Sequence, residues 1–491
     1  MAITEGSALN SVASSQKQTL STNYLDLAAT ANEGWAQQYV PDLMEKEAEV
    51  FGNRTISGFL SQIGAEEPMT ADQVVWSEQS RLHISLKGTI DLNGGAGTQG
   101  RFVVVTDIDG NKANTPSVFT PANHGVRVND TVLLSSGNTV VKALVTAVSG
   151  ADIDVKSYET AVLEGLSEVG SATTLLVYGS EFKKGDTYGG SDARTANEPT
   201  FKSFSNKPII LKDYYEVSGS DASRIGWVEI TSEEGQSGYL WYLKAESDTR
   251  SRFTDYLEMS MLESQVAAAA SVADTALAGA GTATGTQGLF DAIEERGNVT
   301  SGISGVNAAT DLAEFDAILA EFDKQGAIEE NMMFVNRATS LAMDDMLASM
   351  NSYGAGGTSY GVFSNDEDMA LNLGFSGFRR GSYDFYKSDF RYLNDKATRG
   401  GINATAGSAA IRGVIIPAGT SSVYDQNLGK NLTRPFLHVR YRASQTDDRK
   451  MKTWVTGSVG AATSSLDAMQ LHFLSERCLI TQGANNFMIM K

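Results

Sequence analysis

The serine of Gly357–Gly361, GTSYG, lies in a G-x-S-x-G pattern, which is the arrangement of a hydrolase nucleophile elbow. Such an elbow requires a buried strand before the serine and a helix after it, with His438 or His472 as its base. The residues before Ser359, NSYGAGG, are instead typical of a loop. We therefore expect a surface loop at this position and predict no catalytic residue.

Two further motifs resemble cofactor or metal sites. Gly95–Gly100, GAGTQG, matches G-x-G-x-x-G, but the RFVVVTD that follows predicts a strand where nucleotide binding needs a helix. Asp107–Asn111, DIDGN, alternates oxygen ligands as calcium loops do, yet its glycine comes too early and no glutamate closes the loop. A hinge and a tight hairpin turn fit these motifs better, so we predict no cofactor and no metal.

The composition excludes several classes of protein. The 491 residues carry a formal net charge of -20, which argues against a broad nucleic-acid-binding surface but not against enclosing nucleic acid. Cys478 is the only cysteine, so no intrachain disulfide is possible, and we expect it to be a buried apolar residue. The first 24 residues lack a signal-peptide pattern, and no segment has about 20 consecutive apolar residues. A cytosolic product without a membrane partner is expected.

A long helix is the element most clearly predicted. Residues 239–265 contain neither glycine nor proline, in a chain with 48 glycines. Thr231 and Glu234 fit a capping box that would start the helix, and VAAAASVADTALA would extend it until GAGTATGTQG breaks it. An apolar stripe is formed by Leu240, Leu243, Phe253, Tyr256, Leu257 and Met261.

Residues 101–178 differ from the rest of the chain in composition, and their pattern predicts a small β-barrel. Their short runs of valine, leucine and threonine indicate five to six strands, with hairpin turns at Asp109-Gly110 and Gly137-Asn138. The stretches 72–90 and 198–220 on either side are extended and alternating, so we expect them to pair as a long hairpin that carries the barrel.

The remainder predicts a mixed α/β region with terminal strands. Two amphipathic helices, LAEFDAILAEFDKQG and RATSLAMDDMLASMN, flank a buried strand NMMFVN. GSYDFYKSDFRYL and RGVIIPAG indicate further strands, and the last 60 residues are rich in them. Residues 1 to about 50 have few apolar anchors, so they need other surfaces to lie on.

This order of parts resembles the major capsid protein of tailed phages, with the Hong Kong 97-like fold, and more distantly the crAss-like phage group. The resemblance is carried by FSNKPIILKDYYEVSGS before the helix, GLFDAI after it, NMMFVNRAT, YDFYKSDFRYLN, VIIPAG and the terminal ERCLITQGANNFMIM. It implies an α+β fold with an inserted barrel. The implied parts are an N-terminal arm (1–60), an extended hairpin loop (61–100 and 179–220), the barrel (101–178), a spine helix and peripheral domain (221–285), an axial α/β domain (286–385) and returning strands (386–491).

The resemblance also implies a function. The chain would assemble with copies of itself into the pentamers and hexamers of an icosahedral virion head that encloses double-stranded DNA. Its other partners would be a portal protein and auxiliary, decoration or head-fibre proteins. The alternative from a different class is a surface-layer or adhesin protein, against which the absence of a signal peptide counts.

The expected contacts between subunits lie mainly on the second arm of the hairpin. From Glu181 to Lys212 six basic residues oppose four acidic ones, giving +2 in an acidic chain. Glu246, Asp248, Asp255, Glu258 and Glu263 on or near the long helix are candidate partners in a neighbouring copy. The contact candidates are Lys183, Lys184, Arg194, Phe201, Lys202, Phe204 and Lys207, together with Arg379, Arg380 and Trp35. Solvated lysines on a loop, and a solvated surface at the arginines, are the alternatives.

Overall fold

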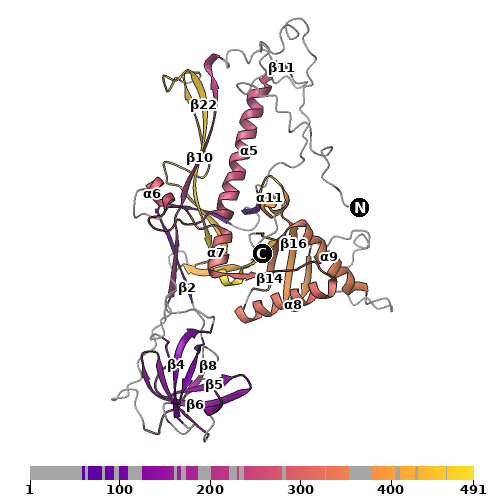
Figure 1. Cartoon of the computed structure of the whole chain (residues 1–491). Coiled ribbons are helices and arrows are strands. Elements are labelled where there is room, and N and C mark those ends of the chain that lie inside the picture. The colour runs from indigo at the N-terminus through magenta and orange to yellow at the C-terminus, as the bar shows by residue number, and fades with distance from the viewer. Residues whose placement is uncertain are drawn as a thin grey trace. The chain divides into compact units, whose positions relative to one another are not determined.

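The chain is a mixed α+β protein, rich in sheet, that divides into two compact units (Figure 1). One unit is Val75–Ser205, and the other combines Met1–Val74 with Asn206–Lys491. The computed structural model describes residues 58–60, 65–79, 83–92, 99–108, 124–159, 163–166, 173–185, 201–220, 229–231, 237–278, 284–326, 328–352, 377–403, 410–425, 430–459 and 462–491.

The smaller unit contains a closed six-stranded barrel, as the sequence predicts. Its strands follow the order β3-β4-β7-β6-β5-β8 around the barrel. They are β3 (Ser85–Asp91), β4 (Gln99–Asp107), β5 (Asp130–Ser136), β6 (Thr139–Ser149), β7 (Asp152–Ser157) and β8 (Thr173–Ser180), with a 3-10 turn η2 (Leu163–Gly165). β3 belongs to this barrel although the sequence placed it in the hairpin, because strand alternation shows which face is buried but does not identify the partner strand.

Alternating side chains fill the barrel. Along β3 every second residue is buried, and Phe102, Val132, Leu134 and Ile153 are fully enclosed. The turn between β5 and β6 has Gly137 at φ 56°, which confirms the predicted hairpin turn and explains its glycine. At the β3 bulge, a Cβ on Gly88 would lie 2.1 Å from the carbonyl oxygen of Val103, so only glycine fits there.

A short two-stranded ladder lies at the ends of the barrel unit. It pairs β2 (Val74–Gln79) with β9 (Phe201–Asn206), which confirms that part of the predicted hairpin. The rest of the second arm behaves differently. β10 (Ile209–Ser218) pairs along its whole length with β22 (Ala468–Thr481), because the terminal strands provide a longer apolar partner.

The larger unit holds a five-stranded sheet around the long β22. One edge of β22 pairs with β10, and the other pairs with β21 (Lys452–Gly457) and then with β20 (Leu437–Arg442). β1 (Ala65–Met69) lies parallel to β20.

The predicted long helix is present as α5 (Leu240–Glu263), but both of its predicted ends are wrong. Thr231 does not cap it, because it ends β11 (Glu229–Thr231), which pairs with β12 (Ser237–Tyr239). The helix also stops before the alanine-rich stretch. Ala270 has φ 63°, and a separate short helix α6 (Val272–Ala278) follows. Of the stripe, Phe253, Leu257 and Met261 are buried, whereas Tyr256 is 45% exposed.

A second sheet, of six strands, forms the α/β part of the larger unit. Its order is β13-β23-β17-β14-β16-β15. The strands are β13 (Asn298–Thr300), β14 (Glu330–Val335), β15 (Gly377–Arg380), β16 (Tyr383–Asp389), β17 (Gly413–Pro417) and β23 (Met488–Met490). A separate hairpin pairs β18 (Thr420–Asp425) with β19 (Lys430–Pro435).

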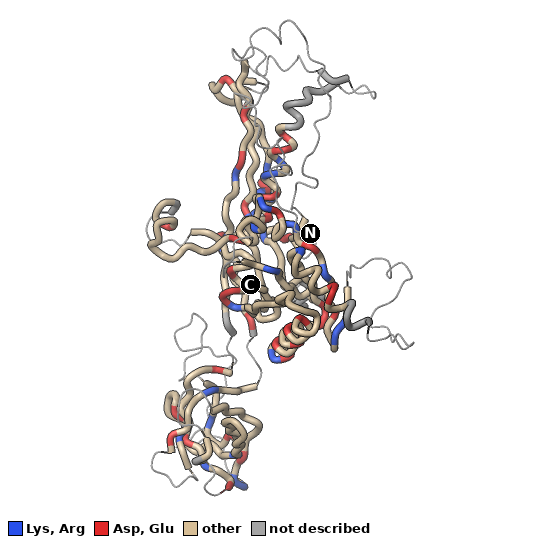
Figure 2. Tube along the Cα trace, turned by 45° about the vertical axis from the view of Figure 1, so that its right-hand side comes forward, with Lys and Arg blue, Asp and Glu red and all other residues tan. Residues whose placement is uncertain are grey.

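Helices cover this second sheet, with α8 and α9 beside each other (Figure 1). They are α7 (Leu289–Arg296), α8 (Ala308–Gln325), α9 (Arg337–Ser352), α10 (Arg391–Asn394) and α11 (Arg399–Asn403), with a 3-10 turn η5 (Ala484–Asn486). The predicted buried strand between two amphipathic helices is confirmed, since Phe334 and Val335 of β14 are enclosed. Acidic and basic residues are interspersed over both units in Figure 2.

Candidate functional site

The predicted contact residues of the hairpin are only partly described. Lys183, Lys184 and Lys207 are exposed, as a contact between copies would require. Phe201 and Lys202 belong to β9, but their side chains lie outside the described part, as do Arg194 and Trp35 altogether. Phe204 is half-buried, with its ring 6.2 Å from that of Trp76.

The two predicted arginines already have partners within the chain. Arg380 on β15 forms a two-pronged pair with Asp316 of α8, with Nε–Oδ1 and Nη2–Oδ2 distances of 2.5 and 2.7 Å. Arg379 is more exposed, and its Nε lies 3.7 Å from Asp384 Oδ1. Arg380 therefore joins a helix to the edge of the sheet, and Arg379 stays a candidate for an outer contact.

Two of the acidic residues proposed as partners are also engaged within the chain. Glu258 of α5 accepts the backbone N–H groups of Gly58 and Leu60 at 3.1 and 3.2 Å, and burial raises the pKa of its carboxyl. Glu263 accepts hydrogen bonds from Tyr392 Oη on its Oε1 and from Arg399 Nη1 on its Oε2, both at 2.8 Å. Contact of Glu246, Asp248 and Asp255 with another copy stays a prediction.

The sheet of β10, β22 and β21 presents a broad face on the side away from α5. Three rings lie in one cross-strand row there: Tyr214, His472 and Trp454. The His472 ring is stacked with both neighbours, at centroid distances of 6.0 Å to Tyr214 and 5.1 Å to Trp454. Thr456 Oγ1 lies 2.7 Å from His472 Nε2, which fixes the central ring. This row, with the exposed Ile210, is the aromatic face.

The opposite side of the same sheet packs against α5. Phe253 and Leu257 of α5 meet Leu471 and Phe473 of β22, with Leu211 of β10 packed against them. Among the described residues this cluster has four buried side chains, while Ile210 and Tyr214 on the outer side are 53% and 56% exposed. We name the three strands together with α5 the sheet arm.

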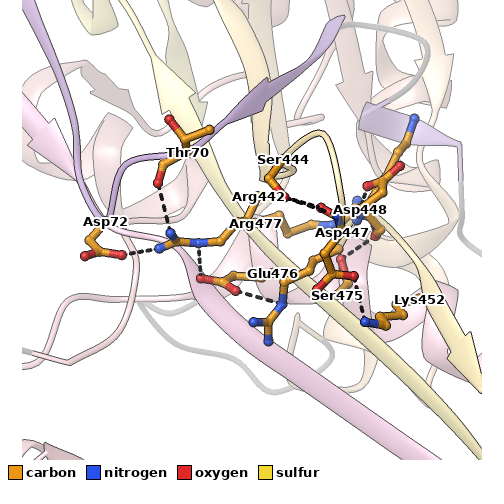
Figure 3. A network of polar contacts seen from close by, with 12 residues as sticks. Thr70, Asp72, Arg442, Ser444, Asp447, Asp448, Lys452, Ser475, Glu476 and Arg477 are labelled. Atoms are coloured by element: carbon orange, nitrogen blue, oxygen red, sulfur yellow. Dashed lines mark hydrogen bonds and ion pairs between the residues drawn. The ribbon is translucent and has the colours of Figure 1, made fainter.

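A network of charged side chains lies at the base of the sheet arm (Figure 3). Glu476 of β22, only 5% exposed, pairs through Oε1 with Arg442 Nε at 2.7 Å and through Oε2 with Arg449 Nε at 3.1 Å. Arg442 also pairs with Asp72 and donates to the Thr70 carbonyl oxygen at 3.0 Å. The residues after β1, the end of β20 and the middle of β22 are thereby joined.

Arg477 extends this network. Its Nε donates to Ser475 Oγ and its Nη2 to the Lys450 carbonyl oxygen, both at 2.9 Å. Nη1 lies 3.6 Å from Glu66 Oε1, and the other oxygen of Glu66 pairs with Lys450. Burial lowers the pKa of Arg477, and the carboxylates of Glu66 and Glu258 act against this by stabilising the charged guanidinium.

Asn206 holds the end of β9 in place. Its amide nitrogen donates to the carbonyl oxygens of Leu479 and Gln287 at 2.6 and 3.0 Å. Its amide oxygen accepts from Thr286 Oγ1 and from the Gln287 N–H at 3.0 and 2.9 Å. The start of β10 is therefore rigidly positioned on β22, a role of Asn206 that no local sequence pattern indicated.

The chemical motifs have few structural counterparts. Gly357–Gly361 lies outside the described residues, as do Gly95–Thr98 of GAGTQG and Asp109–Asn111 of DIDGN, while a strand follows GAGTQG as expected. Cys478 is fully buried, as predicted, and burial raises the pKa of its thiol to about 12. The described residues contain no group of three His, Cys, Asp or Glu suited to a metal ion. Among them no helix is long and apolar enough to cross a membrane.

Comparison with known proteins gives similarity in structure alone. No protein family matches this chain, and no curated protein matches it. Solved structures to which it is similar include chains from Microbacterium phage Oxtober96 (8% identity, TM-score 0.37) and Mycobacterium phage Ogopogo (10%, 0.39), each covering 93% of this chain and 98% of the other. Another is a capsid structure of the cyanophage P-SCSP1u, at 6% identity and TM-score 0.38, covering 95% of this chain and 96% of that one.

Proposed function

We propose that this chain is the structural subunit of a closed phage shell, a major capsid protein of the Hong Kong 97-like type. The observation that carries the proposal is the sheet arm. Its 24-residue helix and 14-residue strand meet in a described cluster of four buried side chains, join the main core only through residues such as Met261, Leu262 and Leu479, and leave large apolar residues in solvent. A slender arm of this kind is stabilised most when neighbouring copies cover it.

The exposed residues of the sheet arm support association. Tyr214 and Ile210 on β10 and Tyr256 on α5 are each between 45% and 56% exposed. Burying apolar surface contributes about 25 cal/mol per Å², so a few such side chains at a contact outweigh the weak surface ion pairs around them. Repeated in pentamers and hexamers, the same small contact becomes a stable lattice.

The remaining parts of the proposal follow from charge. A net charge of -20 is compatible with a shell that encloses double-stranded DNA without binding it sequence-specifically, because an acidic subunit does not attract the phosphates strongly. The basic hairpin residues Lys183, Lys184 and Lys207 are then contacts between copies. A portal protein and auxiliary or head-fibre proteins complete the particle, the protein resides in the virion shell, and it has no enzymatic role.

Electron microscopy of the purified, recombinantly expressed chain tests this proposal. Closed polyhedral particles are the expected result, and analytical ultracentrifugation should show a species far heavier than the 52.4 kDa subunit. Flat sheets would favour the surface-layer alternative. A monomer at all protein concentrations, with or without co-expressed neighbouring genes, contradicts both.

A further inference from the structure

The outer surface of the barrel has two different faces. On β4 and β7, Arg101 Nε lies 3.0 Å from Asp154 Oδ1 and its Nη1 lies 3.4 Å from Asp152 Oδ2, so this face is polar and internally paired. Strands β6, β5 and β8 carry apolar residues on their outer side. Leu133 of β5 lies between Lys142 of β6 and Leu176 of β8 in one row.

The apolar side chains of the second face gather into one patch. They are Leu133, Leu144 and Leu176, which are partly exposed, and Val140, Tyr158 and Tyr178, which are 58%, 51% and 53% exposed. The barrel interior is already filled by the alternate residues of the same strands, among them Val132, Leu134 and Ala143. The patch therefore has no role in the barrel core and is free to contact another molecule.

Opposite charges lie on either side of Tyr158. Its backbone N–H donates to the carbonyl oxygen of Lys142 at 3.1 Å, and its hydroxyl donates to Glu181 Oε2 at 2.5 Å. Burial, together with Glu181, raises the pKa of Tyr158 to about 12, so the hydroxyl keeps its proton and the ring is held in place. Lys142 is exposed and lies opposite Leu133 on the outer side of β6.

We propose that this patch is a contact between the barrels of two copies of the chain, related by a twofold axis near Tyr158. A twofold axis places Lys142 of each copy opposite Glu181 of the other, so a single patch complements itself in charge as well as in apolar surface. A closed barrel has no free strand edge, which leaves side-chain contact as its means of association. The proposal rests on the proposed function only in that a shell brings many copies together.

The sequence offers a clean probe of this contact. Cys478 is the sole cysteine and is fully buried, so an introduced cysteine is the one reactive thiol of the folded chain. Val140→Cys lies within the patch, and Ser149→Cys, at the far end of the same strand β6, is the matched control. Both full-length proteins are treated with a short bismaleimide, and dimers are measured on denaturing gels while particles are counted by microscopy.

A dimer is expected for Val140→Cys and not for Ser149→Cys. Adding Lys142→Glu should reduce the dimer to the control level, and adding Glu181→Lys as well should restore it, since the double exchange recreates the opposite charges. Equal cross-linking at both cysteines, an unchanged dimer with Lys142→Glu alone, or cross-linking only to another protein would overturn the proposal. Normal particles without the cross-linked dimer would contradict the barrel contact but not the proposed shell function. A cross-linked dimer without particles would support the barrel contact and contradict the proposed shell function.

Discussion

The barrel and the sheet arm are both built mainly from antiparallel strands, yet their apolar side chains are buried in different ways. The barrel closes on itself, and its core cluster has 15 buried hydrophobic residues drawn from residues 86–175. Where α5 lies on β22 in the sheet arm, the described cluster has four buried hydrophobic residues, and the remaining buried residues of these elements, such as Met261 and Leu479, belong to the main core of the larger unit. We expect closure to make the first region sufficient for its own stability, whereas the open geometry of the second leaves part of its stability to neighbouring elements and, in our proposal, to other copies. The two regions should therefore respond differently to similar substitutions.

The largest effect is expected in the barrel core. Phe102→Ala removes a fully buried ring and should cost about 3–5 kcal/mol of unfolding free energy. Hydrogen exchange measured by mass spectrometry should show lost protection in β3 to β8 and unchanged protection in β14 and β22. Val103→Ala, the outward neighbour, should leave the exchange nearly unaltered. Loss of protection in both units after Phe102→Ala would mean that the barrel is not independent.

The charged network at the base of the sheet arm should be nearly as sensitive. Glu476→Ala leaves Arg442 and Arg449 without their buried carboxylate, and breaking a buried pair in this way costs about 3–5 kcal/mol. Asp447→Ala breaks the Lys452 pair, whose side chains are 43% and 45% exposed, and should cost at most about 1 kcal/mol. Urea unfolding followed by tryptophan fluorescence reports mainly on this unit, since four of the five tryptophans lie outside Val75–Ser205, and Trp76→Phe as a common background removes the fifth. Equal losses in the two variants would show that the network does not support the sheet.

A smaller effect on stability, but a clear one on assembly, is expected at the aromatic face. Tyr214→Ala should change the unfolding free energy by no more than about 0.5 kcal/mol, because the ring is mostly exposed. If neighbouring copies cover this face, the same change should lower the yield of particles in light scattering. Ser218→Ala, on the same outer side of β10, serves as control. Particle formation at the normal rate by Tyr214→Ala would exclude the aromatic face from the lattice contacts.

The smallest effects concern pH, and they should have opposite signs in the two units. In the barrel, His124 Nδ1 accepts the Val126 N–H and Nε2 donates to the Gly150 carbonyl oxygen, while burial lowers the pKa of the ring below 6.5. The unfolded chain then binds a proton more readily, so barrel stability should fall as the pH drops below about 6.5.

Glu258 in the larger unit should act in the other direction. Burial raises the pKa of its carboxyl above 4.5, so the folded state binds the proton more readily and stability should decrease as the pH rises through the window above 4.5. Calorimetry of the full chain at several pH values checks both trends, with Glu258→Gln removing only the second. Parallel trends in the two transitions would contradict the assignment.

The comparison also explains what could be predicted from the sequence. The α5 helix and the barrel were predictable, because an absence of glycine and proline and a regular alternation of apolar residues are local signals. The start of α5 was not predictable, because Thr231 matches the pattern of a helix cap but belongs to β11, which pairs with β12. β3 was assigned to the hairpin because strand pattern carries no information about the partner strand.

The charged network was missed for a similar reason. Glu66 and Asp72 are hundreds of residues away in sequence from Arg442 and Glu476, and the only local sign was the dense charge in RYRASQTDDRK. The predicted acidic partners Glu258 and Glu263 were exposed candidates on paper, but the chain itself satisfies both of them. Their partners at Gly58 and Arg399 come from elements that only tertiary folding brings near α5.

The pairing of the first and last barrel strands has one more consequence. Ser85 of β3 lies opposite Leu176 of β8, so the chain enters and leaves the barrel through antiparallel neighbours about 5 Å apart. In the gene, the barrel is therefore one uninterrupted block whose two ends meet in space. We expect that recombination could delete that block, or exchange it for another domain with adjacent termini, and leave the rest of the chain able to fold. The barrel would then act as a replaceable module, and its position in the chain would be a site for displaying a foreign domain.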